Sequence, residues 1–510
     1  MLYLFIIRIP MKLKHILPNS LALIAGALLT LAFAPFHLFP LAIISPAILL
    51  GIWLKSSIKQ AFWRGWLFGV GLFTTGVYWI YISVHTFGNA SAFFAVIVTG
   101  ALIGILALFP ALNGYLLNRF FPNNNTTKIV CAFPAIWVLL EWVRTWVFSG
   151  FPWLFIGTSQ INSPLKGFAP IFSVYGVSLA ALLSSALLVN AIIEFKRSRN
   201  RWGYFNLAGI ALIWIVGACL STIAWTQPTD KQVKVSLVQG NIAQDLKWMP
   251  EHVQPTLDRY VELTQPHWDS QIIVWPESAI PVPFQTAADF LNTMAYKAKE
   301  HQSTFITGIP MKAPQSESYY NAVVALGNGG GVYAKRLLVP FGEYIPMRSS
   351  LGRVLDLLHV PMSDFIPNKD PMQPIVADGV KIATFICYEI AYPEQVLLRD
   401  GNIDLILTVS NDAWFGHSIA QAQHLEMAQM RALEMGRPVL FASNDGITAI
   451  INARGKIQAR APQYQSFVLT GDVQTVKGKT PWQSIAMDPI LMILVGLLII
   501  AIVRRKYHAH

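Results

Sequence analysis

Long apolar runs are the feature of this chain that most restricts its fold. A helix that crosses the hydrocarbon core of a bilayer needs about 20 mostly apolar residues. About eight such runs stand out, most of them before a long polar segment and one after it. They are Leu21–Ala34, Leu38–Leu54, Trp63–Val84, Phe93–Leu117, Ile129–Phe148, Phe168–Ile193, Phe205–Trp225 and Ile485–Val503. We therefore expect a polytopic α-helical membrane bundle of about eight spans.

The composition supports this class of protein. Charged residues make up 13% of the sequence, whereas soluble domains carry about 25%. The first two apolar runs are short and interrupted by prolines, so a hairpin of tilted or re-entrant helices is the alternative there. No small-residue cleavage site follows the first run, which we expect to be retained rather than removed as a signal peptide.

Basic residues are distributed unevenly among the connections between the runs. They gather on alternate connections, which hold Arg8, Lys12, Lys14, Lys55, Lys59, Arg119, Lys128, Lys196, Arg197, Arg199, Arg201, Arg504, Arg505 and Lys506. The other connections carry almost none, with Lys166 as the clear exception. Because cytoplasmic loops are enriched in Lys and Arg, we expect both termini in the cytoplasm and the polar segment outside it. The net charge of +11 therefore does not indicate a nucleic-acid partner.

The polar segment has a different pattern, in which short β-branched runs alternate with helix-like stretches. The expected helices are Pro250–Thr264, Ala287–His301, Pro393–Arg399 and Ile419–Glu434, and the strand-like runs include Ile272–Trp275, Val332–Arg336 and Lys381–Ile386. This alternation predicts an α/β domain. The chain is thus expected to comprise a bundle of about seven spans (residues 1–226), an α/β domain (227–483) and a closing helix with a tail (484–510).

Three residues at the ends of expected strands carry complementary chemistry: Glu277, Lys335 and Cys387. A thiolate attacks carbonyls, a carboxylate can take the thiol proton, and an ammonium stabilises both the thiolate and the oxyanion. Side chains at neighbouring strand ends of an α/β sheet converge on one crevice. The backbone N–H of Tyr388 is a second candidate oxyanion donor.

Each of these residues also has an ordinary structural explanation when taken alone. A cysteine after an apolar strand is usually a core residue, a Glu after Trp-Pro a turn acid, and a Lys a solvated charge. Cys131 and Cys219 lie within apolar runs, so the three cysteines do not indicate a disulfide framework. The eleven histidines are scattered and no Cys/His spacing resembles a metal site, so we expect neither metal nor cofactor.

The phrases around the three residues resemble the signature regions of the nitrilase, or carbon–nitrogen hydrolase, superfamily. They are Trp275-Pro-Glu277, Lys335-Arg-Leu-Leu-Val-Pro340-Phe-Gly-Glu343 and Cys387-Tyr-Glu389, followed by Ser410-Asn-Asp-Ala-Trp414-Phe-Gly416 and Arg431-Ala-Leu-Glu434. The resemblance implies a catalytic triad of Glu277, Lys335 and Cys387. It also implies a nitrilase-like αββα sandwich as the fold of the extracytoplasmic domain.

The whole chain resembles the bacterial apolipoprotein N-acyltransferase family, with several spans, a nitrilase-like domain and one closing span. Val238-Gln-Gly-Asn241 and Leu246-Lys-Trp248 also carry the resemblance. It implies functional roles for Trp248, Glu343, Tyr388 and Glu389, with structural hydrogen bonding as the alternative for the two glutamates. Phe341 and Trp414 are candidate substrate-binding residues because aromatic rings suit the bilayer interface; ordinary packing is the alternative for them.

The reaction implied by this resemblance is a two-step, ping-pong acyl transfer. Cys387 would take a fatty acyl chain from a phospholipid, phosphatidylethanolamine, as a thioester. The α-amino group of the S-diacylglyceryl-cysteine of an apolipoprotein would then attack the thioester. Glu277 would be the general base, Lys335 the oxyanion partner, and Glu343 would hold Lys335. The implied location is the bacterial inner membrane, with the catalytic domain on the periplasmic side.

Two other functions stay open on the residues alone. A membrane-anchored amidase of the same superfamily would use water as the acyl acceptor. A catalytically silent nitrilase-like domain would serve as a binding module. The intact triad argues against the silent module, and the full-length resemblance argues against the amidase.

Overall fold

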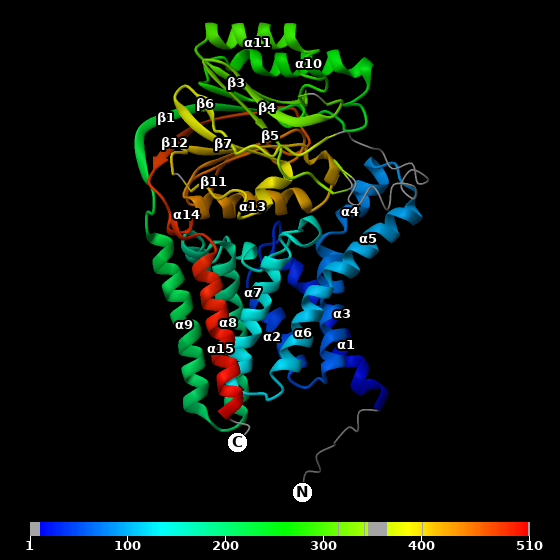
Figure 1. The fold of residues 1–510 in the computed structure, drawn as a ribbon, viewed down its shortest axis with the longest axis vertical. Helices are drawn as coiled ribbons and strands as arrows, with labels where there is room; N and C mark the ends of the chain where they lie inside the picture. The colour runs from blue at the N-terminus through cyan, green and yellow to red at the C-terminus, as the bar shows by residue number, and fades with distance from the viewer. Residues whose placement is uncertain (1–10, 315, 341, 345–364, 400, 508–510) are drawn as a thin grey trace.

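The computed structural model describes residues 11–314, 316–340, 342–344, 365–399 and 401–507. A bundle of helices lies beneath a domain built of strands and helices (Figure 1). Helix α1 (Met11–Leu29) starts, and helix α15 (Asp488–Tyr507) ends, at the end of the bundle away from that domain (Figure 1). The two ends of the described chain therefore lie on the same side of the bundle.

Helices of membrane-spanning character form this bundle. Besides α1 and α15, the α-helices of the bundle are α2 (Leu41–Trp53), α3 (Ile58–Gly76), α4 (Trp79–Ile82), α5 (Ala92–Leu106), α6 (Leu108–Phe120), α7 (Phe133–Val143), α8 (Ala169–Lys196) and α9 (Asn200–Thr222). Among the described residues, three stretches are long and apolar enough to cross a membrane: Ala92–Phe120, Pro164–Lys196 and Asn200–Thr222. A fourth is added if the bent pair formed by α3 and Trp79–Phe87 is one span. Length and composition thus identify three or four crossings among the described residues, and the expected count of about eight stays a prediction.

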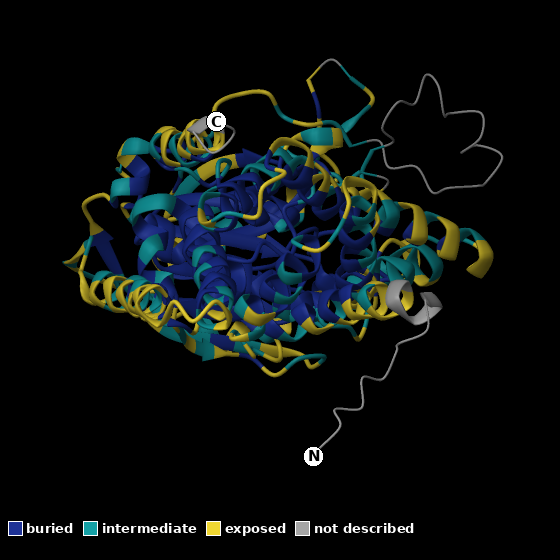
Figure 2. Ribbon diagram, turned by 90° about the horizontal axis from the view of Figure 1, so that it is seen from below, coloured by how far each residue is buried: buried dark blue, intermediate teal, exposed yellow. Residues whose placement is uncertain are grey.

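The outer surface of the bundle is apolar, as a lipid environment requires. Figure 2 shows buried residues filling the interior and exposed residues on the outer faces of the helices. On α9, Leu212 and Ile215 are 62% and 60% exposed. A soluble protein rarely shows a continuous apolar face of this kind to water, so this surface indicates contact with lipid tails.

The expected span Trp63–Val84 is not one straight helix. Helix α3 ends at Gly76, and the chain continues after a bend of 54°. The bend brings Trp79 against two rings from other segments, with centroid distances of 5.1 Å to Trp153 and 4.7 Å to Phe415. Packing against the domain above therefore accounts for the direction of α4.

Within the described residues, the domain contains a single 12-stranded sheet in the order β11-β10-β9-β8-β7-β6-β5-β4-β3-β2-β1-β12. Its strands are β1 (Gln227–Gln239), β2 (Ile272–Val274), β3 (Thr304–Lys312), β4 (Tyr319–Gly327), β5 (Gly329–Ala334), β6 (Ile375–Ala377), β7 (Val380–Ile386), β8 (Leu405–Ser410), β9 (Val439–Ser443), β10 (Ala449–Ile451), β11 (Ile457–Arg460) and β12 (Phe467–Lys477). Its helices are α10 (Pro250–Thr264), α11 (Ala288–Glu300), α13 (Ala420–Met435) and the short α14 (Pro481–Ile485). Strands β1–β3 and β7–β9 pair in parallel, whereas the others are antiparallel.

The sheet folds so that its two halves face each other across one core. Val235 and Val274 from the first half share this core with Ile382 and Leu407 from the second half. Helices α10 and α11 cover the outer face of the first half, and α13 covers that of the second half (Figure 1). This gives the layered αββα arrangement that the resemblance implies.

Helix α13 joins the domain to the bundle. Its Glu434 accepts hydrogen bonds from Ser173 Oγ (2.7 Å) and Val174 N (2.8 Å), where the backbone of α8 departs from helical geometry. Its Glu426 accepts a hydrogen bond from Ala34 N (3.2 Å) in the connection between α1 and α2. Buried carboxylates on the domain thus satisfy backbone donors that the broken bundle helices leave open.

The predicted helices of the domain are mostly confirmed, and one is wrong. Helix α10 has the predicted bounds, and α13 differs by one residue at each end. The expected helix Pro393–Arg399 is a turn, and the 3₁₀ helix η8 (Cys387–Ala391) stands before it. Cys387 begins η8 with a positive φ of 53°, which lies outside α-helical geometry.

Candidate active site

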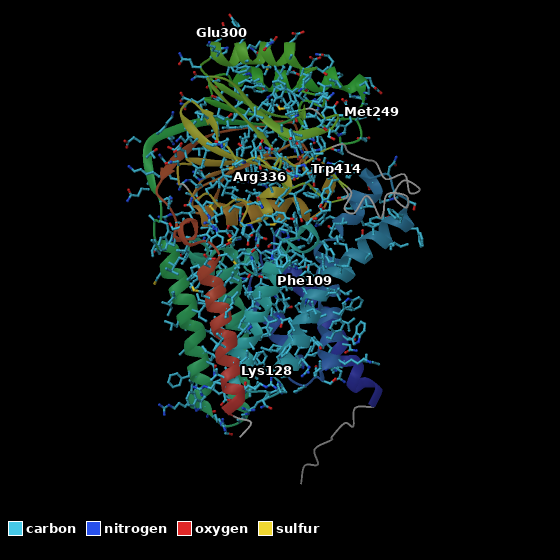
Figure 3. All side chains as sticks on the ribbon, viewed as in Figure 1. Phe109, Lys128, Met249, Glu300, Arg336 and Trp414 are labelled. Atoms are coloured by element: carbon cyan, nitrogen blue, oxygen red, sulfur yellow. The ribbon has the colours of Figure 1, made fainter. Side chains whose placement is uncertain are left out.

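The structure brings Glu277, Lys335 and Cys387 together from three separate strands. Glu277 follows β2, Lys335 follows β5, and Cys387 follows β7. Lys335 Nζ lies 3.5 Å from Glu277 Oε1. The thiol of Cys387 is close enough to both side chains to interact with their charges. Arg336, the neighbour of Lys335, is labelled in Figure 3 between the upper helices and the bundle.

Lys335 is held as an ammonium by two carboxylates. Its side chain is 1% exposed, and Nζ lies 2.9 Å from Oε1 and 2.8 Å from Oε2 of Glu343. Burial alone would lower the pKa of Lys335, but the Glu343 and Glu277 carboxylates outweigh it and raise that pKa above its ordinary value. The site therefore contains a fixed positive charge beside the thiol.

Glu277 is surrounded by hydrogen-bond donors. Its Oε1 accepts from Asn321 Nδ2 (2.7 Å), and its Oε2 accepts from Asn411 N (2.8 Å). Gly308 on β3 allows this close packing, since a Cβ there would lie 2.5 Å from Ser278 N, next to Glu277. The carboxylate is thus fixed in place with one oxygen facing Lys335.

Asn321 is a site residue that the sequence reasoning missed. It stands on β4, and its Nδ2 atom donates to Glu277 Oε1 and also to Glu343 Oε1 (2.9 Å). One amide therefore bridges the two carboxylates that flank Lys335. The sequence does contain a signal for Asn321, which is a polar residue followed by the apolar residues of a strand. The neighbouring residues of β4 on that side are buried.

Cys387 combines a strained backbone with a thiol that resists ionisation. A left-handed conformation costs a non-glycine residue about 1 kcal/mol or more, and such strain is typical of functional sites. Burial raises the pKa of the Cys387 thiol well above its ordinary value, the Glu277 carboxylate raises it further, and the Lys335 ammonium acts in the opposite direction. Ionisation of the Cys387 thiol is therefore disfavoured in the folded site.

Glu389 connects the segments that carry Lys335 and Cys387. Its Oε1 accepts from Arg336 N (2.7 Å) and Leu337 N (3.1 Å). Its Oε2 accepts from Ile386 N (2.8 Å) and Tyr333 OH (2.8 Å). Four donors occupy the carboxylate, so this geometry favours the structural role over contact with a substrate.

Tyr388 faces the bundle rather than the triad. Its hydroxyl donates to Gly150 O (3.2 Å), and its ring is stacked on Trp153 with an interplanar angle of 18° and a centroid distance of 6.4 Å. Trp153 Nε1 in turn donates to Gln423 Oε1 on α13 (2.7 Å). The residue after the nucleophile thus anchors the site to the connection between α7 and α8.

Two of the other predicted residues, Trp248 and Trp414, have exposed side chains. Trp248 is 46% exposed and is followed by Met249, which Figure 3 labels at the side of the domain. Trp414 is 37% exposed and lies 6.1 Å from the Phe87 ring, and its carbonyl accepts a hydrogen bond from Ser83 Oγ (2.7 Å). It therefore stands where the domain meets the bundle. Phe341 lies outside the described residues.

A second group of ionisable residues lies behind the triad and was also missed. Lys247 Nζ donates to the backbone O of Glu277 (3.0 Å). Burial lowers the pKa of Lys247 to about 8, although the Glu277 and Asp445 carboxylates act to raise it. Burial raises the pKa of Asp445 to about 7, with Asp412 adding to the rise and Lys247 opposing it. His424 bridges Asp412 and the backbone of Cys387.

A metal site and a cavity are two other places where a ligand could bind. No cluster of three or more metal-ligating side chains occurs among the residues that the structure describes. A cavity of about 30 Å³ lies inside the bundle, lined in part by Asn113, Glu141 and Arg144. It has room for about two water molecules, and the Arg144 guanidinium beside it lies over the Phe155 ring at 4.8 Å. It is separate from the triad.

Two family models match the chain. The model described as the apolipoprotein N-acyltransferase N-terminal domain matches residues 25–187, and the carbon–nitrogen hydrolase model matches residues 234–479. The second match contains all three residues of the triad. The first match lies in the bundle and ends within α8, and the second match lies in the domain above it.

Several curated proteins are similar over nearly their whole length. The apolipoprotein N-acyltransferase of Coxiella burnetii is 46% identical over 94% of this chain and 99% of that protein. That of Pseudomonas putida is 41% identical over 95% of this chain and 96% of that protein. Among solved structures, a carbon–nitrogen hydrolase from Helicobacter pylori G27 is similar at 15% identity, over 48% of this chain and 89% of that one, with a TM-score of 0.37. On the strength of the full-length relatives, this chain belongs to the apolipoprotein N-acyltransferase family.

Proposed function

We propose that this chain transfers a fatty acyl chain from a membrane phospholipid to the N-terminal amine of the S-diacylglyceryl-cysteine of apolipoproteins. The observation that carries the proposal is a thiol, a carboxylate and an ammonium held together at the face of the domain that meets an apolar bundle. The names of its relatives support the same acceptor. Phosphatidylethanolamine is the proposed donor.

In the first step, Cys387 attacks the ester carbonyl of the phospholipid. Glu277 accepts the thiol proton as the S–C bond forms, and Lys335 stabilises the oxyanion of the tetrahedral intermediate. The intermediate then expels the glycerol oxygen, which takes the proton from Glu277 and leaves as lysophospholipid. The product is a thioester on Cys387.

In the second step, the amine of the acceptor attacks the thioester. Glu277 accepts a proton from the amine, the C–S bond breaks, and the proton returns to the sulfur of Cys387. The amide product leaves and the thiol is restored. Because the same two groups serve both steps, the acceptor can use the site that the lysophospholipid has left.

The surrounding residues have supporting roles in this scheme. Glu343 keeps Lys335 charged and oriented, and Glu389 holds the two segments that carry Lys335 and Cys387. The backbone N–H of Tyr388 is the second oxyanion donor. Trp248, Phe341 and Trp414 are proposed to contact the acyl chains or the membrane surface.

We further propose that the chain crosses the bacterial inner membrane about eight times, with both termini in the cytoplasm and the catalytic domain in the periplasm. The support is that basic residues gather at one end of the bundle. Arg505 Nη1 donates to Phe120 O (2.7 Å), beside Arg119, and Asn124 Nδ2 reaches Leu54 O, next to Lys55. Lys128 is labelled at this end in Figure 3, opposite the domain. Cytoplasmic ends carry such an excess of Lys and Arg.

One experiment tests the proposed reaction. Purified protein is incubated with phosphatidylethanolamine, and the mass of the peptide containing Cys387 is measured before and after addition of a diacylated lipopeptide. We expect an acyl adduct that passes to the peptide amine. Cys387→Ala should form no adduct, whereas Cys131→Ala, a change at a cysteine in the bundle, should behave as the unchanged protein.

The other outcomes separate the alternatives. An adduct that is lost to water and never appears on the peptide would support the amidase. The absence of any adduct with several phospholipids would support the silent binding module.

A further inference from the structure

His424 lies directly behind the nucleophile, although the reaction above gives it no part. It stands on α13 and is 0% exposed. Its Nε2 atom lies 3.1 Å from the backbone O of Cys387, and its Nδ1 atom lies 3.0 Å from Asp412 Oδ1. The imidazole therefore bridges a buried carboxylate and the backbone of the reactive residue.

The two contacts determine which atom of the ring donates. A backbone carbonyl can only accept, so Nε2 must carry a hydrogen. A neutral imidazole then has no hydrogen on Nδ1, yet Nδ1 faces a carboxylate oxygen. The ring therefore faces Cys387 with Nε2 and Asp412 with Nδ1, and this pair of contacts fixes its orientation.

The ring has little freedom to turn away from this arrangement. The Phe441 ring packs edge-on against it with a centroid distance of 5.1 Å and an interplanar angle of 82°, and the Phe415 ring lies edge-on at 6.0 Å. Trp153 lies 6.0 Å away on the side of the bundle. Aromatic side chains from the domain and from the bundle thus fix the imidazole together.

Asp412 is also linked to the side chain of Cys387. Ser410 Oγ donates to Asp412 Oδ1 (2.6 Å), and the Ser410 hydroxyl interacts with the Cys387 thiol. One carboxylate oxygen is thus connected to the nucleophile twice, through His424 to its carbonyl and through Ser410 to its sulfur. Both connections end on a residue whose φ of 53° is strained.

We propose that His424 is a positioning residue, which holds the carbonyl of Cys387 and thereby aims the thiol at Glu277 and the substrate carbonyl. Left-handed backbone at a bulky residue persists only where its surroundings over-determine it. The Asp412–His424 pair supplies that constraint through the carbonyl of Cys387. This role rests on the proposed acyl transfer, because the thiol is aimed for that reaction.

Two amide substitutions separate the two ends of the bridge. In His424→Gln the side-chain amide reaches the position of Nε2 and can donate to Cys387 O. In His424→Asn the shorter amide reaches only the position of Nδ1 and can bond Asp412. The initial rate of thioester formation on Cys387 is measured at several phosphatidylethanolamine concentrations, together with the thermal midpoint of each variant.

We expect His424→Asn to lower the rate at saturating phospholipid by about 100-fold, as a misplacement of about 1 Å does. The rate of His424→Gln should be at least about tenfold higher than that of His424→Asn. One retained hydrogen bond of about 1.4 kcal/mol corresponds to this factor. The half-saturating phospholipid concentration should stay the same in both variants. Met427→Leu, a volume-conserving change one turn away on α13, should leave the rate unchanged.

Equal rates for the Gln and Asn variants, or a change confined to the half-saturating concentration, would overturn the proposal. A lower thermal midpoint without a rate difference would assign His424 to folding alone. If the unchanged protein forms no thioester, the proposed function fails, and alkylation of Cys387 by iodoacetamide in the same variants still tests whether His424 aims the thiol.

Discussion

Glu277 acts on Cys387 in two opposing ways. In the proposed reaction it receives the thiol proton as a base, and as a charge it raises the pKa of the thiol. The proton therefore leaves sulfur only while a carbonyl is being attacked, when Lys335 can stabilise the new oxyanion. A thiol that stays protonated between turnovers is protected from other electrophiles, since the thiolate is the reactive form.

These two effects of Glu277 predict that its removal changes two reaction rates in opposite directions. Glu277→Gln should lower acyl transfer by about 100-fold or more, because the general base is lost. The same change should speed alkylation of Cys387 by iodoacetamide at pH 8, because a carboxylate that raises the thiol pKa has been removed. The two rates are measured on one preparation. Lys335→Met is the matched control and should slow both reactions; faster alkylation in both variants would contradict the charge assignment.

Asp445 gives a pH-dependent prediction for stability. Burial raises the pKa of Asp445 to about 7, so between pH 4 and 7 the unfolded chain is ionised while the folded carboxyl keeps its proton. Ionisation of Asp445 is disfavoured in the folded protein, so the free energy of unfolding falls as the pH rises from 4 to 7. Asp445→Asn removes that loss. The difference in thermal midpoint between the variant and the unchanged protein should therefore increase from pH 4 to 7. Above pH 7 this difference should stay constant.

The measurement is a series of thermal scans of the detergent-solubilised protein at half-unit pH steps. A constant difference between the two proteins across this range would show that Asp445 ionises in the fold as easily as in the unfolded chain.

Among the secondary-structure elements, β2, β5 and β7 deliver the triad at their ends, and this placement could be predicted. Lys335 and Cys387 directly follow β5 and β7, and Glu277 follows β2 after Trp275 and Pro276, so the local pattern was sufficient to place them near strand ends. Asn321 and His424 could not be found this way, because they stand inside a strand and a helix. The partner of a polar residue inside a strand or helix comes from a distant part of the chain, so the sequence pattern does not reveal it.

Tertiary packing also explains the elements that differ from expectation. The break between α3 and α4 follows from the contact of Trp79 with Trp153 and Phe415, which are far away in the sequence. The expected helix Pro393–Arg399 also lies among long-range contacts, since Glu394 Oε1 accepts a hydrogen bond from Tyr175 OH and Leu398 O accepts one from Gln483 Nε2. Long-range contacts outweighed local propensity in both places.

Glu389 gives a prediction at the junction of β5 and β7. Glutamine has one side-chain oxygen, so in Glu389→Gln its NH₂ group must face two donors that the carboxylate now satisfies. Each unsatisfied buried donor costs about 1–3 kcal/mol, and we expect the free energy of unfolding to fall by about 2–4 kcal/mol. Thermal unfolding measures this. Glu300→Gln at the exposed end of α11 is the control and should change little. Loss of activity with an unchanged midpoint would instead favour a direct catalytic role.

For the molecule as a whole, the bundle is part of the site's construction as well as its support. Tyr388 stacks on Trp153 and bonds Gly150, and Glu434 binds the broken start of α8. The nucleophile's turn is thus held between the sheet and the membrane helices. For the lipid substrate proposed above, each buried CH₂ contributes about 0.8 kcal/mol, so a site at the bilayer surface avoids extracting a whole acyl chain into water.

The orientation of the two ends of the molecule gives the last prediction. Tyr296 is 70% exposed on α11, at the end of the domain farthest from the bundle, and Arg201 is exposed at the start of α9, at the opposite end (Figure 1). In a background in which Cys131, Cys219 and Cys387 are replaced by Ala, we expect Tyr296→Cys to react with a membrane-impermeant maleimide on intact spheroplasts. Arg201→Cys should react only after permeabilisation, because basic loops stay in the cytoplasm. The reverse pattern would place the triad on the cytoplasmic side, and labelling of both without permeabilisation would mean that the bundle does not separate the two ends.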